Sequence, residues 1–457
     1  MERYGISVEI KNVPVLDPEF TPLLKFNQEF LKTAKKPLSI AVERSDGQMS
    51  THHTFIHGTP EMKATDCYYI DRLVKTELWM KGGYKVYVND KDIYEYLADA
   101  YRAEGSRAFD WDFMADVFEK PFEVVYTEEI PETLDKPVPM GGHLDGCRIG
   151  FDAGGSDRKV SAVIDGECVY SEEVIWFPKL NEDPDYHYNH ILEAFQTAAS
   201  KMPRVDGIGV SSAGDYIDNE PRVASLFIKV PRENWDKVKT IYTRAAAAIG
   251  DVPLVVANDG DVSALAGAMG LGKGKLMGLA MGTSEAVGYV DKDQNVLGWI
   301  NELAFAPVDL NKDAMQDEWS TDFGVGCKYF SQDAVIKLCP AAGIELDESL
   351  SLAEKLKAVQ KLMEADDPRA IAIFETIGAY FGYTTVLYSQ FYDLDYIMLM
   401  GRVMSGKGGD TILRVTNEIL AEEYPELAKK ILVTLPDEKM RRVGQAVAAA
   451  SLPLIAK

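Results

Sequence analysis

The chain has few cysteines, and their placement argues against a disulfide framework. Of 457 residues only five are cysteine, and no two of them form a Cys-x-x-Cys pair: Cys67, Cys147, Cys168, Cys327 and Cys339. Secreted domains held together by disulfides have even numbers of cysteines at regular spacings. We therefore expect five reduced thiols.

Basic residues are also scarce. Lysine and arginine number 48 against 72 aspartates and glutamates, which gives a formal net charge of −24 at pH 7. Nucleic-acid backbones are attracted by basic faces, so we expect no nucleic-acid partner. A phosphate ligand would have to be held locally, by backbone N–H groups, a metal ion or single basic side chains.

Long apolar runs are missing as well. No run approaches the roughly 18 apolar residues of a membrane helix, and Met1-Glu2-Arg3-Tyr4 does not open a signal peptide. We therefore expect a cytoplasmic protein without a membrane partner.

Residues 1–128 are predicted to form an additional α/β domain. Two strands flank the turn at Ser45-Asp46-Gly47, followed by a helix over Tyr68–Lys81, a strand over Tyr84–Val88 and a helix over Asp92–Ala103. His52, His53 and His57 are possible metal ligands, but no carboxylate set accompanies them. The role of this domain stays open: a lid, a dimer interface or a specificity element.

A linker is predicted over residues 129–146. This stretch is rich in proline, glycine and acidic residues, as boundaries between domains tend to be.

The segment around Asp259 is the first candidate for chemistry. Pro253-Leu254-Val255-Val256 predicts a short buried strand, and an alanine-rich helix follows from Val262, so Asn258 and Asp259 fall on the turn between them. Ligands of open α/β sheets bind outside the carboxyl ends of the strands. The alternative is that Asp259 or Asp261 only caps the helix. This segment alone leaves both open.

Two glycine hairpins surround that segment in the sequence. The first is Asp152-Ala153-Gly154-Gly155-Ser156, and the second is Met281-Gly282-Thr283-Ser284. Glycine lets a backbone approach a phosphate closely, and a neighbouring carboxylate such as Asp152 can hold a hydrated Mg²⁺. Each hairpin alone is equally compatible with an ordinary turn, but two of them favour a nucleotide site.

One similar motif is a false lead. Residues 267–274 nearly match the spacing of a P-loop, but Gly274 stands where serine or threonine is needed, and a helix precedes the motif instead of a strand. We interpret it as a connection from a helix to a strand.

The order of these motifs resembles the ROK family of sugar kinases, within the actin-like, hexokinase-like ATPase superfamily. The resemblance covers about residues 147–457. Beside the two hairpins, it rests on Gly207–Gly214, Asn258–Gly267, Met400-Gly401-Arg402-Val403 and Gly444-Gln445-Ala446. It implies an α/β fold with two ribonuclease H-like ATPase lobes, 147–257 and 258–457, on either side of a cleft.

The resemblance also implies an activity and a set of site residues. Asp259 would be the general base of an ATP-dependent sugar kinase, and Asp152 would hold Mg²⁺ through water. The residues expected to bind the substrate are Asn258, Glu302, Ser212 and Gly214. Those expected to bind ATP are Gly154, Gly155, Ser156, Gly282, Thr283, Ser284, Gly401 and Arg402. Dimers are usual in this family, so we expect a homodimer.

The chain departs from the family pattern around the sugar and zinc positions. Phe305 stands where the family commonly has a histidine, and Tyr329 where it has a glutamate. Of the family's zinc-binding cysteines only Cys327 remains. We therefore predict no structural zinc, and a sugar or polyol substrate other than plain glucose.

Two other functions stay open. Family members also act as repressors, but these carry a basic helix-turn-helix at the amino end, which residues 1–128 do not resemble. A sugar- or nucleotide-sensing protein without catalytic activity is one alternative. The other is an enzyme that transfers the phosphoryl group to a non-sugar acceptor or to water.

Overall fold

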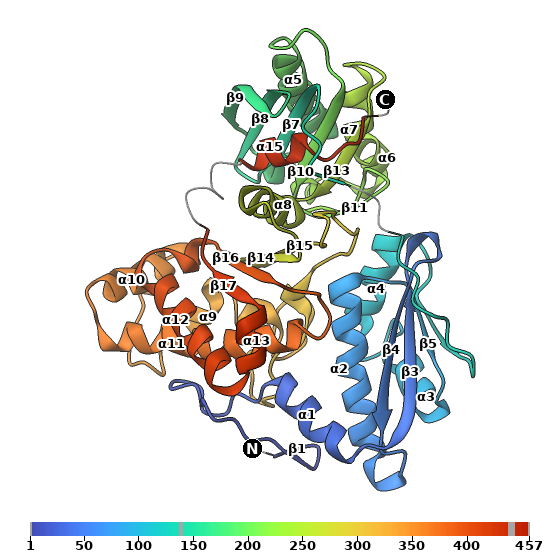
Figure 1. The fold of residues 1–457 in the computed structure, drawn as a ribbon, viewed down its shortest axis with the longest axis vertical. Coiled ribbons are helices and arrows are strands. Elements are labelled where there is room, and N and C mark those ends of the chain that lie inside the picture. The colour runs from blue at the N-terminus through green and yellow to red at the C-terminus, as the bar shows by residue number, and fades with distance from the viewer. Residues whose placement is uncertain (1, 137–139, 437–443, 456–457) are drawn as a thin grey trace. The chain divides into compact units, whose positions relative to one another are not determined.

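The structure is a computed structural model that describes residues 2–136, 140–436 and 444–455. The chain folds into two compact units, whose elements are labelled in Figure 1. Unit 1 combines Met1–Lys136, Leu279–Val287 and Trp299–Leu435, and unit 2 combines Pro137–Gly278, Gly288–Gly298 and Pro436–Lys457. The predicted boundaries at residues 128, 146 and 257 stay a prediction. The alanine-rich sequence of residues 443–450 also predicts a last helix, and Val443 at its start lies outside the described residues.

Unit 2 is built on a five-stranded sheet in the order β13-β10-β7-β8-β9. Strands β7, β10 and β13 are parallel, whereas β8 and β9 continue from β7 as an antiparallel meander. The strands are β7 (Cys147–Ala153), β8 (Asp157–Ile164), β9 (Glu167–Ile175), β10 (Gly207–Ser212) and β13 (Leu254–Asn258). The main helices are α5 (Pro184–Ala199), α7 (Ile241–Ala247), α8 (Asp259–Leu271) and α15 (Gln445–Ala450). Shorter elements are η3 (Pro178–Leu180), β11 (Asp215–Ile217), β12 (Glu220–Val223), η4 (Ser225–Phe227), η5 (Arg232–Asn234) and α6 (Trp235–Lys239).

Helix α15 lies directly on strands β7 and β10 (Figure 1). A Cβ atom on Gly150 would collide with the carbonyl oxygen of Ala446, and one on Gly209 with that of Ala449. Both glycines lie in strands, so the contact needs the absence of a side chain and not a special backbone conformation. The end of the chain is thereby fixed against the strands that carry Asp152 and Ser211.

Gly209→Ala is expected to destabilise the protein, because its methyl group would push α15 away from the sheet. Overpacking of this kind costs about 1–3 kcal/mol. Urea unfolding measures the loss. Gly250→Ala is the matched control, since its Cβ would meet nothing nearer than 3.8 Å. Equal stability of the two variants would show that α15 does not pack as tightly as described.

The carboxyl-terminal part of unit 1 surrounds a second sheet, of order β15-β14-β16-β17. The strands are β14 (Leu276–Met281), β15 (Glu285–Val290), β16 (Tyr396–Met400) and β17 (Leu432–Thr434). The helices are α9 (Gln332–Leu338), α10 (Leu352–Glu364), α11 (Pro368–Tyr388), α12 (Lys407–Glu423) and α13 (Pro425–Lys430). Three 3₁₀ turns complete it: η6 (Leu303–Phe305), η7 (Gly326–Lys328) and η8 (Arg402–Met404).

Helix α11 is the one helix of the described residues that is long and apolar enough to cross a membrane by length and composition. In the structure 83% of its apolar window is buried, as in the core helix of a soluble protein.

The amino-terminal part of unit 1 has a four-stranded sheet in the order β4-β3-β5-β6, on which helix α2 packs (Figure 1). Its strands are β3 (Lys36–Glu43), β4 (Met49–Ile56), β5 (Lys85–Val88) and β6 (Glu123–Tyr126), and β1 (Glu2–Arg3) pairs with β2 (Ile6–Ser7). Its helices are α1 (Leu23–Thr33), α2 (Lys63–Lys81), α3 (Lys91–Ala100) and α4 (Ala108–Phe118), with turns η1 (Ser45–Gly47) and η2 (Pro60–Met62). The predicted order of two strands, helix, strand and helix is present.

A buried network of six charges ties this part to the loop around Asp322. The Asp322 carboxylate accepts a hydrogen bond from Arg72 at 3.0 Å and pairs with Arg107 at 3.0 Å and Lys75 at 3.4 Å. Asp71 and Asp110 neutralise the other two positive charges, through Arg72 at 2.7 Å and Lys75 at 2.7 Å. Three cations and three anions therefore balance inside unit 1.

Candidate active site

Asn258 ends strand β13, and helix α8 begins at Asp259. The Asn258 side chain accepts a hydrogen bond from the Gly260 N–H at 2.7 Å and donates one to the Gly214 carbonyl at 2.8 Å. The N-cap of α8 is thus Asn258. The alternative considered from the sequence, a cap at Asp259 or Asp261, is wrong: the strand runs two residues further than expected, to Asn258, and the helix begins directly after it. Asp261 is 4% exposed and accepts from the Tyr289 N–H at 3.2 Å.

Three parallel strands bring the polar residues of unit 2 to one edge of the sheet. Ser211 on β10 is in register with Asp152 on β7, and Ser212 is in register with Asn258 on β13. The Ser211 hydroxyl donates to the Asp152 carboxylate at 3.0 Å. This is the carboxyl edge of the strands, where ligands of open α/β sheets bind.

Gln445 connects these groups and was missing from the predicted site residues. Its side-chain amide donates to the Ser211 hydroxyl at 3.0 Å and to the backbone carbonyl of Asp259 at 2.9 Å. The sequence contained a signal, because Gln445 belongs to the Gly444-Gln445-Ala446 motif. Its hydrogen bond to the Asp259 carbonyl depends on the packing of α15 on the sheet, which the sequence does not show.

Both aspartates of this edge have raised pKa values. Burial raises the pKa of Asp152 to about 6, the Ser211 hydrogen bond opposes the rise, and the charge of Asp259 adds to it. Burial also raises the pKa of Asp259. The hydrogen bond from the Gly260 N–H and the positive charge of Lys179 act in the opposite direction and lower it. A carboxylate with a raised pKa is a better proton acceptor near neutral pH.

Trp176 donates two hydrogen bonds to the first hairpin. The Trp176 indole N–H donates to the Gly154 carbonyl at 2.7 Å, and its backbone N–H donates to the Ser156 carbonyl at 3.1 Å. These bonds use carbonyl oxygens. Among the described residues, the N–H groups of Gly154, Gly155 and Ser156 make no hydrogen bond outside regular strands, so they are free to bind an anion.

Ser212 and Gly214 form hydrogen bonds with neighbouring residues of the site. The Ser212 hydroxyl is fully buried and lies 2.6 Å from the Tyr216 hydroxyl and 3.0 Å from that of Tyr242. Gly214 has a φ of +121° and provides the carbonyl that orients Asn258. Their predicted contact with the substrate stays a prediction.

In unit 1 the second hairpin lies beside the motif at Gly401. Within the turn the Gly282 N–H donates to the Ser284 carbonyl at 3.0 Å, and the Gly282 carbonyl accepts from the Gln332 N–H at 2.9 Å. Gly401 has a φ of +94°, and a Cβ there would collide with the backbone of Met281. The structure therefore brings together two predicted ATP-binding segments, Gly282–Ser284 and Gly401-Arg402.

The predicted departures from the sugar-binding pattern have packing partners. Glu302 precedes turn η6, and Phe305 at its end packs against Trp79 and Phe109 with ring centroids 4.6 and 5.3 Å apart. Tyr329 is buried and donates to Asp309 at 2.5 Å. Tyr329 belongs to the interior of unit 1, and Phe305 is half-buried against aromatic rings of α2 and α4.

Glu285 is a buried carboxyl that sequence reasoning missed. It is 4% exposed, its Oε1 lies 3.4 Å from the Tyr388 hydroxyl, and its Oε2 has no hydrogen-bond partner among the described residues. Burial raises its pKa to about 8, and the charge of nearby Glu302 adds to the rise. A glutamate at the start of a hairpin strand gives no sign of burial.

Glu285→Gln is expected to remove a pH dependence of stability. Glu285 keeps its proton in the folded protein up to a pKa of about 8, while the unfolded chain releases it near the ordinary value of 4.5. Wild-type stability should therefore fall as the pH rises from about 4.5 to 8, by up to roughly 1.4 kcal/mol per pH unit. Urea unfolding of wild type, Glu285→Gln and the exposed control Glu348→Gln at pH 5 to 8.5 measures this. Identical slopes would show that Glu285 ionises normally.

The predicted histidine and zinc-loop residues have protein partners. The two ring nitrogens of His57 lie 2.9 Å from Asp66 and 2.8 Å from the Thr33 hydroxyl, and His53 lies 2.8 Å from the Ser39 hydroxyl. The Cys327 thiol donates to Asp317 at 3.4 Å. Among the described residues no group of three or more histidine, cysteine or acidic side chains is placed to hold a metal ion. The absence of zinc stays a prediction.

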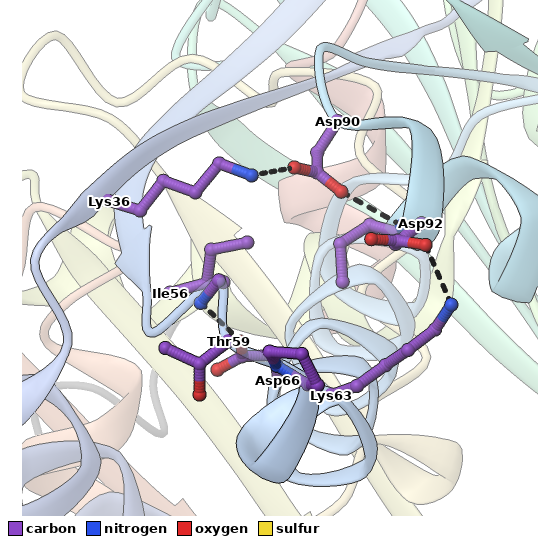
Figure 2. A pocket seen from close by; sticks show the side chains of 10 residues that line it. Lys36, Ile56, Thr59, Lys63, Asp66, Asp90 and Asp92 are labelled. Carbon is purple, nitrogen blue, oxygen red and sulfur yellow. Dashed lines mark hydrogen bonds and ion pairs between the residues drawn. The ribbon is translucent and has the colours of Figure 1, made fainter.

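A pocket of about 330 Å³ lies between the ends of β3, β4 and α3 in the amino-terminal part of unit 1 (Figure 2). Its charges are paired across the opening: Lys36 with Asp90 at 2.6 Å and Lys63 with Asp92 at 2.6 Å. Asp66 accepts from the Gly58 N–H at 2.8 Å. A charged ligand would have to break these pairs.

Comparison with known proteins settles the fold. No family model and no curated protein matches the sequence. The structure matches a ROK hexokinase from Thermus thermophilus with a TM-score of 0.52 and 16% identity, over 67% of this chain and 97% of that one. It also matches a ROK family transcriptional regulator, a homolog of the E. coli MLC protein, with a TM-score of 0.50 and 15% identity, over 68% of this chain and 79% of that one. The fold is that of the ROK proteins. The predicted two-lobe α/β fold is thus confirmed, whereas the additional amino-terminal domain stays a prediction. At these identities the ROK fold alone is shared.

Proposed function

We propose that the protein is an ATP-dependent kinase that phosphorylates a hydroxyl group of a sugar or polyol, with Asp259 as general base. The observation that carries this proposal is the placement of Asp259 and Asp152 at the carboxyl edge of three parallel strands, with Asn258 taking the capping role. A carboxylate that neither caps a helix nor forms an ion pair is available for proton transfer.

The reaction needs a base that takes one proton from the acceptor. The hydroxyl oxygen attacks the γ-phosphorus, its proton passes to the Asp259 carboxylate, and the bond to the β,γ-bridging oxygen breaks. ADP leaves with that electron pair. Gln445 and Asn258 fix the backbone on both sides of this carboxylate, which keeps it at one position for the attack.

Mg²⁺ suits the Asp152 carboxylate. In proteins this ion is held by one or two carboxylates together with substrate phosphates, and it keeps several waters. Asp152 provides one carboxylate, oriented by Ser211, and burial is the main cause of its raised pKa. When bound, Mg²⁺ would neutralise phosphate charge.

For ATP we propose Gly154, Gly155 and Ser156 of unit 2, and Gly282, Thr283, Ser284, Gly401 and Arg402 of unit 1. For the acceptor we propose Asn258 and Glu302, with Ser212 and Gly214 in support. Phe305 and Tyr329 cannot form the hydrogen bonds of a histidine and a glutamate. This supports an acceptor other than plain glucose. We further propose a cytoplasmic homodimer.

ADP release from Mg-ATP across hexoses, amino sugars, pentoses and polyols tests this function. The proposal predicts release that depends on one class of acceptor. Release without any acceptor would favour an ATPase, and no release despite bound ATP would favour a sensor. The fold shared with a ROK transcriptional regulator keeps the sensor as the second candidate.

A further inference from the structure

Lys179 lies on the first hairpin, although the sequence places it more than twenty residues later. It belongs to turn η3 (Pro178–Leu180). The position that a Cβ atom of Gly155 would take lies 3.1 Å from the Lys179 Cε and 3.4 Å from its Nζ. The lysine side chain therefore folds back over the glycine turn. A side chain on Gly155 would push it away.

The backbone that carries Lys179 is fixed from two sides. Trp176, which is fully buried, holds the segment to the carbonyls of Gly154 and Ser156. On the other side the Phe177 N–H donates to the Tyr186 hydroxyl at 2.9 Å, and the His187 ring lies 3.0 Å from the Pro178 carbonyl. This support fixes the backbone of Lys179, whose side chain is exposed to solvent beside the glycine turn.

The ammonium group of Lys179 makes no ion pair or hydrogen bond within the described parts of the chain. By contrast, Lys159 on the same hairpin lies 3.6 Å from Asp157 and 3.9 Å from Glu173. The charge of Lys179 reaches the Asp259 carboxylate, whose pKa it lowers. Lys179 is thus a positive charge available between the hairpin and the base.

An anion at the hairpin would meet two kinds of donors. The free N–H groups of Gly154, Gly155 and Ser156 provide partial positive charge, and Lys179 provides a full one. Phosphoryl transfer depends mainly on neutralising the charge of the phosphoryl oxygens. Since the chain carries a net charge of −24, a local cation matters more here than in a neutral protein.

We propose that Lys179 is a catalytic residue that binds the terminal phosphoryl group of ATP at the first hairpin. This inference rests on the proposed kinase function. Lys179 transfers no proton: the acceptor proton goes to Asp259, the acceptor oxygen bonds to phosphorus, and ADP leaves with the electrons of the broken bond. Lys179 holds the phosphoryl oxygens throughout and faces the base with its positive charge.

The test compares ATP with ADP, which lacks the group that Lys179 is proposed to hold. Calorimetry in the presence of Mg²⁺ gives both dissociation constants for wild type, Lys179→Met, Lys179→Arg and the control Lys229→Met, an exposed lysine of the same unit. We expect Lys179→Met to weaken ATP binding by about tenfold or more, to leave ADP binding within about twofold, and to lower kcat by roughly 10²-fold. Lys179→Arg should recover part of each loss, and Lys229→Met should resemble wild type.

Two results would overturn the inference. Equal effects on ATP and ADP would mean that Lys179 does not hold the terminal phosphoryl group. A changed pH profile of kcat with unchanged ATP binding would mean that it acts on Asp259 alone. If wild type binds neither nucleotide, the proposed function itself fails and this inference falls with it. Far-ultraviolet circular dichroism of each variant confirms folding.

Discussion

Asp259→Asn is expected to lower kcat by about 10²–10⁴-fold, the usual contribution of a general base. Asparagine has nearly the same shape and keeps an acceptor oxygen for the Gly260 N–H, which the aspartate binds at 3.0 Å. It cannot take a proton from the acceptor hydroxyl. ATP binding should therefore stay within a few-fold of wild type. Steady-state kinetics and nucleotide calorimetry measure the two quantities separately.

Asp251→Asn is the matched control for that experiment. Asp251 lies on the exposed turn before β13, in the same unit, so the variant makes the same chemical change away from the strand edge. It should keep wild-type turnover. If Asp259→Asn retains more than about a tenth of wild-type kcat, the base is another group and the assignment of Asp259 is wrong.

The largest expected loss of stability comes from Asp322→Ala. Three cations share this carboxylate inside unit 1: Arg72, Lys75 and Arg107. Removing it leaves three positive charges against the two of Asp71 and Asp110. Breaking a buried ion pair from one side costs about 3–5 kcal/mol, because a charge stays buried without compensation. Chemical unfolding, followed by far-ultraviolet circular dichroism, measures the change.

The control for Asp322→Ala is Asp313→Ala. The Asp313 side chain is 77% exposed, and its nearest basic partner, Lys312, lies 3.9 Å away at the surface. Surface substitutions usually change stability by less than about 0.5 kcal/mol. A loss below about 1 kcal/mol for Asp322→Ala would mean that water reaches the network and screens it.

The sequence predicted the fold of the two ROK-like lobes because their signals are local. Apolar runs such as Leu254–Val256 mark buried strands, and glycines mark the turns of the two hairpins. The order of these signals, more than any one of them, indicated the ROK fold that the structure has.

Some features depended on contacts between distant residues and were beyond sequence reasoning. Lys179 reaches the first hairpin because Trp176 ties its segment to Gly154, and nothing in the residues around Lys179 signals that contact. Glu285 is polar in the sequence but is enclosed by Tyr388 and by the turn at Gly326. The placement of exposed Lys179 and the burial of Glu285 both depend on tertiary packing.

The start of helix α8 was predicted wrongly for a different reason. The helix after β13 was expected to begin at Val262 but begins at Asp259, because Asn258 ends the strand and provides the cap in a single residue. The helix therefore begins three residues earlier than expected. Asn258 takes the capping position, and the Asp259 carboxylate is left available for chemistry. Helix α1 and the charge network around Asp322 were not predicted at all, since their partners lie far along the chain.

The proposed kinase moves a phosphoryl group from ATP to a hydroxyl of an organic acceptor. Phosphorus-31 NMR of a mixture of wild type, Mg-ATP and the acceptor selected by the ADP-release panel tests this transfer directly. We expect ADP and a phosphomonoester of the acceptor in equal amounts, both absent with Asp259→Asn. ADP together with inorganic phosphate, and no phosphomonoester, would contradict it.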